Sequence, residues 1–425
     1  MTLRSVHFQH FRGFETLPLR LKPGVNLFVG DNASGKTTLI RGVGLVLSSF
    51  FVGFSDENTR FLGLDALDFR RAETVTGMAP SQPIQISFDW LDTQAWLKKD
   101  KEKGRTLTVP LGPLTQKARL LSDSFFEGGK QVKPLPLIGS FSTKDIHSSR
   151  KIKAAPFREY KRKPSFGYYE CLQGDGFLGY WSKRLLILQE ANQANLEVTG
   201  VKQALLRALG EDGCGIITDI HIRHNQGRIY YQLHDGREVP TSQLSDGLIR
   251  LVNLIMDLAF RCMLLNQGLY QFEACEHTQG TVLIDEVDLH LHPSLQALVT
   301  KGLRQAFPKV QFILTSHAPL VMSSVKTSDQ DGIFKLSYTT DAGYSCREVS
   351  SYGMDISSIV EGVLQVTPRD PEIEAKLTHL FGLIDSDQFS EAEQVLANLK
   401  KDFGDRLPDL AKAQTMLDFL QVADD

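Results

Sequence analysis

The chain has 425 residues, of which 42% are hydrophobic and 23% charged, a composition typical of a folded protein large enough for two or three cores. Its formal net charge of -3 excludes a global positive field of the kind that drives non-specific binding to nucleic acid. The five cysteines form no C-x-x-C pair and no spacing typical of a disulfide framework, which fits a reducing cytoplasm.

Residues 1–65, predicted to be the N-terminal half of one nucleotide-binding domain, open with short strands and a glycine-rich loop. Three strands are predicted, at 6–8, 17–21 and 25–29. The third strand runs into the loop, and apolar residues then recur at helical spacing from 37 to 51. Strand, loop and helix in this order are the context that a phosphate-binding unit requires.

The loop from Gly30 to Thr37 matches the pattern G-x-x-x-x-G-K-[ST]. Backbone N–H groups of such a loop wrap phosphates at a helix N-terminus, Lys36 reaches the outer phosphates, and the Thr37 hydroxyl can bind Mg²⁺. The alternative, a glycine turn with an exposed lysine, does not explain the flanking strand and helix. The residues expected to bind ATP here are Gly30, Asn32, Ser34, Gly35, Lys36, Thr37 and Thr38.

Residues 66–235 are predicted to be an inserted α+β segment. Short strands at 84–90 and 135–141, a helix at 201–209 and a hairpin at 217–233 are expected within it. A basic stretch holds eight basic residues against two acidic ones, with aromatic residues interleaved: Lys144, Arg150, Lys151, Lys153, Arg158, Lys161, Arg162 and Lys163. It is either a nucleic-acid or partner-binding patch or a solvated loop, and the sequence favours neither.

Residues 236–350 are predicted to be the C-terminal half of the same domain. They contain a long helix from 245 to 265, buried strands at 281–284 and 310–314, and a helix after Pro293. Arg250, Asp257 and Arg261 interrupt the apolar helix, so it is a poor membrane span. The first residues of the chain also lack the pattern of a secretory signal. A cytoplasmic protein with no membrane partner is therefore expected.

Three features of this segment carry candidate chemistry. Asp285 and Glu286 follow a buried strand, as needed to hold Mg²⁺ and to polarise an attacking water; helix-capping acids are the alternative. Ser245 and Gly247 begin the long helix, where backbone amides can bind an anion, although Ser245 could be a simple N-cap. His317 ends the last buried strand, suited to contact a γ-phosphate or the water.

Together these motifs resemble the ABC-type ATPase heads of the SMC, RecF and OLD group. The resemblance implies an α/β fold, a P-loop head with a mixed sheet, the inserted segment and a helical C-terminal region. It implies ATP and Mg²⁺ as cofactors, and a head-to-tail homodimer or higher oligomer in which Ser245 and Gly247 act on the partner's nucleotide. Asp288 is then a D-loop residue at the dimer seam, and Arg12 lies near the nucleotide.

One departure from the family pattern concerns the Q-loop glutamine. The strand at 135–141, where it is expected, contains none, and Gln85 is only a weak substitute. Coupling between the inserted segment and the Mg²⁺ site is therefore in doubt.

Residues 351–425 are predicted to be an acidic helical region. Glu361 and Asp385-Ser-Asp387 imitate the acids of a TOPRIM nuclease, but their surroundings show helical spacing, so no intrinsic nuclease is expected. His290 and His292 could bind a metal, yet a structural role beside Pro293 is favoured.

The overall layout also resembles the PtuA ATPases of the Septu and retron anti-phage systems. That resemblance implies a regulator of a separate effector, most simply a nuclease. The alternative is a RecF-like ATPase of DNA repair.

Overall fold

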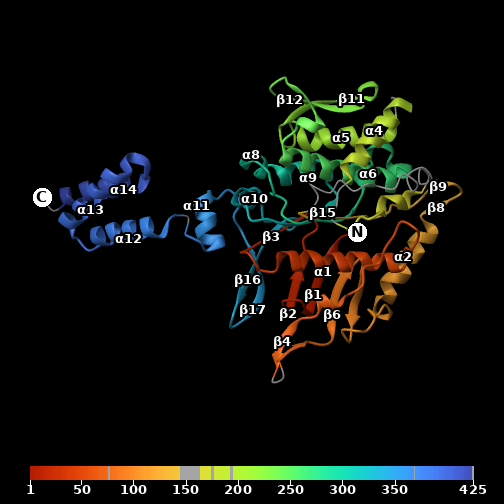
Figure 1. Ribbon diagram of the computed structural model, residues 1–425, viewed down its shortest axis with the longest axis horizontal. Helices are drawn as coiled ribbons and strands as arrows, with labels where there is room; N and C mark the ends of the chain where they lie inside the picture. Colours follow the sequence, from red (N-terminus) through yellow and green to blue (C-terminus); the bar gives the residue numbers. More distant parts are fainter. Residues whose placement is uncertain (75–76, 144–162, 174–176, 192–194, 368, 424–425) are drawn as a thin grey trace. The chain divides into compact units, whose positions relative to one another are not determined.

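The computed structural model describes residues 1–425 except 75–76, 144–162, 174–176, 192–194, 368 and 424–425. The chain forms two compact units, Met1–Ile356 and Ser357–Asp425. Figure 1 shows the elements of both. Each unit is described by itself.

The centre of the first unit is a mixed six-stranded sheet with the order β10-β14-β15-β3-β16-β17. Its strands are β10 (Leu137–Phe141), β14 (Gly280–Ile284), β15 (Val310–Thr315), β3 (Val25–Val29), β16 (Gly332–Thr339) and β17 (Gly343–Val349). All neighbours pair in parallel except β16 and β17. Every residue of β3, β14 and β15 is buried, as expected for parallel strands covered on both faces. The mixed sheet predicted from the sequence is confirmed.

A second sheet is antiparallel, with the order β2-β1-β6-β7. Its strands are β1 (Leu3–Phe11), β2 (Phe14–Arg20), β6 (Ile84–Trp90) and β7 (Thr93–Lys99). The helix α1 (Lys36–Ser48) contacts strands of both sheets and lies between them (Figure 1). The glycine-rich loop connects β3 to α1. Because α1 is packed between the two sheets, the end of that loop is held in place.

Helices cover the other face of the mixed sheet. Figure 1 shows α6 (Asp246–Tyr270) and α9 (Val299–Ala306) there, with α4 (Leu178–Ala191) and α5 (Leu196–Leu209) beyond them. The helix α6 has 25 residues and is buried along nearly its whole length. A buried pair, Arg261 with Asp257 at 2.6 Å, places the charges of this apolar helix inside the protein.

The predicted inserted segment, residues 66–235, contributes to several parts of the first unit. Its strands β6 and β7 complete the antiparallel sheet, while β10 pairs with β14 in the mixed sheet. Its smaller elements are β4 (Arg71–Thr74), β5 (Gly77–Pro80), α2 (Gly112–Ser124), β8 (Phe126–Glu127), β9 (Lys130–Gln131), β11 (Ile217–Arg223) and β12 (Arg228–Leu233), followed by β13 (Glu238–Pro240). The predicted hairpin at 217–233 is the pair β11–β12.

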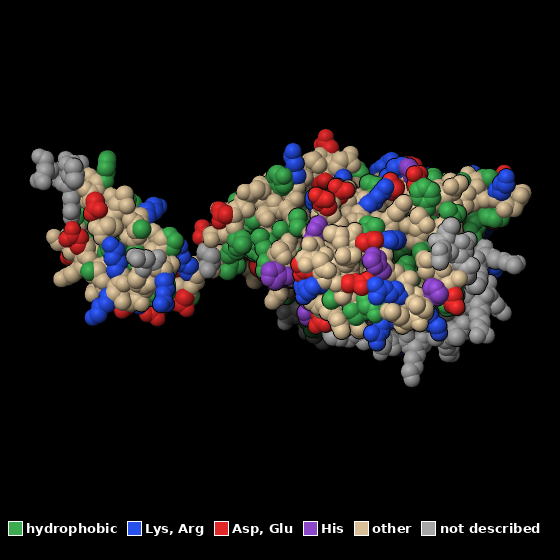
Figure 2. Space-filling view, turned by 90° about the horizontal axis from the view of Figure 1, so that it is seen from above, with side chains coloured by type: hydrophobic (Ala, Val, Ile, Leu, Met, Phe, Trp, Pro, Cys, Tyr) green, Lys and Arg blue, Asp and Glu red, His purple; other side chains and the backbone are tan. Residues whose placement is uncertain are grey.

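The face of the first unit that carries β11 and β12 mixes charges of both signs. Figure 2 shows Lys and Arg side chains interspersed with Asp and Glu side chains there. Arg223 pairs with Glu238 at 2.8 Å, and Arg237 pairs with Asp235 at 2.5 Å. This face is therefore locally neutralised.

The second unit is a bundle of three helices, α12 (Pro371–Asp385), α13 (Phe389–Phe403) and α14 (Pro408–Ala423). Leucine side chains of all three, among them Leu380, Leu396 and Leu417, form its core. Before it, α11 (Ile356–Ser358) and a π-helix (Ile359–Leu364) carry Glu361, and Asp385 ends α12. The helical prediction is confirmed, and neither acid follows a strand.

None of the helices in the described part of the chain is both long enough and apolar enough to cross a membrane.

Candidate nucleotide-binding site

The predicted phosphate loop joins β3 to the first residue of α1. Ala33 (φ 66°) and Gly35 (φ 96°) adopt left-handed backbone conformations, and Gly35 is the residue before the helix. A glycine adopts that conformation at little cost. The loop therefore brings successive N–H groups to the start of a 13-residue helix, where the helix dipole favours an anion.

The Lys36 side chain turns back into this loop. Its Nζ donates to the carbonyl oxygens of Gly30 and Asp31, both at 2.8 Å, and to Ser34 Oγ at 3.2 Å. Burial lowers the pKa of Lys36, and the nearby carboxylates, Asp285 first, partly offset this effect. The ammonium thus lies inside the loop, where phosphate oxygens could replace its carbonyl partners. Asn32 is exposed, and Thr38 is half-buried in the first turn of α1.

The end of β14 brings Asp285 to this loop. Thr37 Oγ1 donates to Asp285 Oδ2 at 3.3 Å, although the two residues are far apart in sequence. Two oxygen-bearing side chains beside a phosphate loop suit Mg²⁺, which keeps most of its ligands as water and phosphate oxygens. The described residues contain no cluster of three or more His, Cys, Asp or Glu side chains that could hold a metal ion.

Thr315, at the end of β15, positions both acidic residues, and no sequence pattern indicates this role. Its hydroxyl donates to Asp285 Oδ1 at 2.6 Å and accepts from the Glu286 N–H at 2.7 Å. A hydroxyl both donates and accepts, so one side chain fixes the carboxylate of Asp285 and the backbone of Glu286. His317, two residues later, leaves the same edge of the sheet and is half-buried.

Arg250 of α6 holds the backbone that follows β14. Its guanidinium donates to the carbonyl oxygens of Glu286 (2.5 Å), Leu289 (3.3 Å) and Asp285 (2.9 Å). Glu286 itself has a left-handed backbone (φ 50°), a conformation that costs free energy for a residue other than glycine. The only sequence signal for Arg250 is a charge on an otherwise apolar helix.

The predicted D-loop contains a buried acceptor with no hydrogen-bond partner. Asp288 Oδ1 is one of the buried side-chain atoms that lack a partner in the described part of the protein. Burial lowers the pKa of Lys36, and the Asp288 charge is the smallest of the carboxylate contributions that partly offset this effect. His292 caps α8 (Pro293–Gln296), with Nδ1 2.9 Å from Ser294 Oγ, in agreement with its predicted structural role.

Ser245 and Gly247 lie against the D-loop of their own chain. Ser245 is exposed and precedes α6. Gly247 is buried, and a Cβ atom built on it would lie 2.2 Å from the carbonyl oxygen of His290. The start of α6 is therefore fixed to the loop after β14, with the Ser245 side chain turned to solvent.

Arg12 has a partner of its own. Its Nε donates to Asp68 Oδ1 at 2.9 Å, and Asp68 is fully buried. The Arg12 guanidinium is thus paired with a buried carboxylate. The adjoining turn at Gly13 lies beside Tyr344.

Two other predicted features lie away from this geometry. Gln85 is on β6 of the antiparallel sheet, where its side chain donates to Ser87 Oγ at 3.1 Å. The end of β10 does reach the site, because the Asp285 N–H donates to the Phe141 carbonyl at 2.9 Å. Most of the basic segment that follows lies outside the described residues; Lys163 at its end pairs with Glu57 at 2.6 Å.

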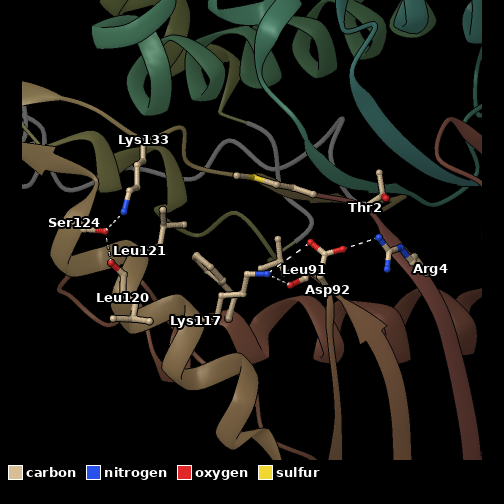
Figure 3. A pocket seen from close by; sticks show the side chains of 11 residues that line it. Thr2, Arg4, Leu91, Asp92, Lys117, Leu120, Leu121, Ser124 and Lys133 are labelled. Carbon is tan, nitrogen blue, oxygen red and sulfur yellow. Dashed lines mark hydrogen bonds and ion pairs between the residues drawn. The ribbon is translucent and has the colours of Figure 1, made fainter.

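A separate cavity of about 340 Å³ lies where α2 meets the turn between β6 and β7 (Figure 3). Asp92 in that turn pairs with Arg4 at 2.6 Å and with Lys117 at 3.7 Å. The lining contains none of the residues predicted to bind nucleotide. The candidate site is therefore the loop at the sheet edge.

Two family models match the chain, and each covers a different part of the candidate site. Residues 5–171, with the phosphate loop, match a family described as "AAA domain". Residues 137–323, with Ser245, Asp285, Glu286 and His317, match one described as "AAA domain, putative AbiEii toxin, Type IV TA system". Both describe ATPase domains, and their matches cover the sheet edge where these side chains converge.

The chain is similar to ATPase domains over most of its length.

Curated proteins that are similar to this chain include proteins of retron and Septu systems. The "Retron Ec83 probable ATPase" of Escherichia coli is 23% identical over 480 aligned residues, covering 95% of this chain and 84% of that protein. The "Septu protein PtuA" of Bacillus thuringiensis is 23% identical over 386, covering 86% and 84%. The "Retron Vc95 probable ATPase" of Vibrio cholerae is 43% identical over 98 residues, which is 23% of this chain and only 18% of that protein.

Among solved structures, the chain is similar to the SMC head domain from Thermotoga maritima. The TM-score is 0.44 at 16% identity, covering 82% of this chain and all of that one.

Proposed function

We propose that this chain is an ABC-type ATPase that binds ATP with Mg²⁺ as a head-to-tail dimer, hydrolyses it, and thereby regulates a separate effector in anti-phage defence. The observation that carries the ATPase part is the convergence of Lys36, Thr37 and Asp285 at one loop. The relatives named for retron and Septu systems support the defence part.

In this proposal the chain's own side chains divide the work at the phosphates. Lys36 leaves its carbonyl partners for the outer phosphates, and the loop N–H groups bind the inner ones. Thr37 and Asp285 hold Mg²⁺, which supplies charge stabilisation to the transferred phosphoryl group. Glu286 orients the attacking water and accepts its proton, and His317 contacts the γ-phosphate or the water.

Dimerisation follows from where the start of α6 lies. Ser245 is exposed and is anchored beside its own D-loop, so its N-terminal amides are available to the nucleotide of a second copy. In the dimer, Asp288 lies at the seam between the two copies.

A mixing experiment tests the shared site. Lys36→Ala disables the loop of one copy and Ser245→Arg blocks the helix start of the other, so one intact composite site forms only in the mixed dimer. The mixture should recover ATP-dependent dimerisation by light scattering and part of the hydrolysis. Ser242→Arg, three residues away and also exposed, is the matched control and should behave as wild type. A mixture no more active than its components, with wild type active, counts against the shared site.

The effector role has a separate test. The chain with its neighbouring genes should protect cells from phage, and Lys36→Ala should abolish protection. The purified chain should not cleave nucleic acid with Mg²⁺ or Mn²⁺. Cleavage that Asp385→Ala abolishes would instead assign a nuclease to the second unit. Unaltered phage sensitivity together with ATP-dependent binding to DNA gaps would favour the repair alternative.

A further inference from the structure

Two tyrosines of the β16–β17 hairpin lie at the rim of the phosphate loop. The Tyr344 hydroxyl donates to the Ala33 carbonyl at 3.3 Å, and its ring lies against Gly13 and Gly35. Its edge meets the ring of Phe14, with 5.1 Å between centroids. Figure 1 shows the hairpin beside β2, which β17 contacts. Tyr344 is therefore held in place between β2 and the loop.

Tyr338 extends this aromatic surface outward. It is the cross-strand partner of Tyr344, with 4.8 Å between the ring centroids, and it is 56% exposed. The other rings described near the loop, Phe14 and Phe28, are fully buried. The open aromatic surface at the loop thus comes from these two tyrosines.

The chemistry of the hairpin differs between its two faces. Lys335 and Arg347 are cross-strand partners, and their separation of three residues from the tyrosine pair places them on the opposite face, because side chains alternate along a strand. The face with Tyr338 and Tyr344 therefore suits a flat aromatic group. It does not suit a phosphate, which would need the cations.

We propose that the Tyr338–Tyr344 pair is the platform on which the base of the bound nucleotide stacks. This rests on the proposed nucleotide binding at the loop: a nucleotide anchored there by its phosphates places its base at the rim. Tyr344, fixed by its hydroxyl and by Phe14, positions the pair, and Tyr338 presents the exposed ring. Stacking on an aromatic ring contributes substantially to binding because every base has a π face.

Calorimetric titration of the full chain in Mg²⁺ tests the platform with two probes, a non-hydrolysable ATP analogue and inorganic tripolyphosphate. Tyr338→Ala should weaken binding of the analogue roughly tenfold and leave the binding of tripolyphosphate unchanged. Tyr338→Phe, which keeps the ring, should restore the affinity for the analogue. Tyr352→Ala is the control, since Tyr352 is similarly exposed but lies beyond the hairpin, and it should change neither.

Three results would overturn the platform. Equal losses for both probes would mean that the pair only supports the loop, and an unchanged affinity for the analogue would mean that the base lies elsewhere. In both cases wild type still binds tripolyphosphate, so the proposed nucleotide site survives. If wild type binds neither probe, the proposed function fails and the platform fails with it.

Discussion

The Thr315 hydroxyl positions two acidic residues that are adjacent in the sequence. It joins the Asp285 carboxylate to the backbone of Glu286, on which the proposed metal and water positions both depend. Sequence patterns identify Asp285 and Glu286 because an apolar strand ends in two acids. They do not identify Thr315, because a threonine at a strand end is common and its partners lie 30 and 29 residues away.

Thr315→Val keeps the side-chain shape and removes both hydrogen bonds. We expect ATP binding within about twofold of wild type, with hydrolysis slowed roughly 10- to 100-fold because the acids lose their positions. Steady-state kinetics measure the split between kcat and KM. Thr300→Val is the matched control, since Thr300 is also buried but its hydroxyl meets only Ser324 at 3.1 Å. A KM effect without a kcat effect would contradict the positioning role.

Glu286→Gln removes the proposed water-orienting carboxylate and leaves the loop intact. Nucleotide and Mg²⁺ binding should persist, while turnover falls by a factor on the order of 10² or more. ATP should then hold the dimer closed, which size-exclusion chromatography with and without ATP would show. Near-normal turnover would assign the water to another group.

The start of helix α6 is packed tightly against the loop that follows β14. Arg250 donates to the carbonyl oxygens of Asp285, Glu286 and Leu289, and Gly247 lies against the carbonyl of His290 within the predicted D-loop, residues 287–293. Any ligand that moves the start of α6 therefore moves the backbone of Glu286 as well.

Gly247→Ala tests this packing. The added Cβ meets backbone at 2.2 Å, so the loop or the helix must shift, at a cost of about 1–3 kcal/mol. We expect a lower urea midpoint and slower hydrolysis in the same variant. Gly362→Ala is the control, because a Cβ there has nothing within 4 Å. Wild-type stability in Gly247→Ala would mean that the contact is easily relaxed.

Sequence patterns predicted the elements whose own residues show a continuous or periodic apolar pattern. They did not predict the elements that depend on which strands pair with one another. Continuous apolar runs gave β3, β14 and β15, and helical spacing gave α1 and α6. The β16–β17 hairpin was not predicted, because β17 shows no apolar face and the buried first half of β16 contains Lys335 and leads into an exposed end. Nor could the sequence show that residues 66–235 supply strands to two sheets, since strand partners are chosen by contacts far apart in the chain.

At the scale of the whole molecule, the second unit has its own core of leucines. A chain ending at Ile356 should therefore keep the loop geometry and bind ATP with an affinity close to that of the full chain. Titration of both forms with the same nucleotide checks this. Loss of binding on truncation would mean that the bundle contributes to the head.

The division into two units also separates electric charge. The first 356 residues hold 41 basic and 36 acidic residues, whereas the last 69 hold six basic and 14 acidic ones. The net charge of -3 is thus the sum of a positively charged first unit and a negatively charged second unit. On a cation-exchange column the truncated head should elute at higher salt than the full chain, and Glu at Lys161, Arg162 and Lys163 should reverse that gain. The negative charge of the second unit would then weaken the binding of the whole chain to polyanions.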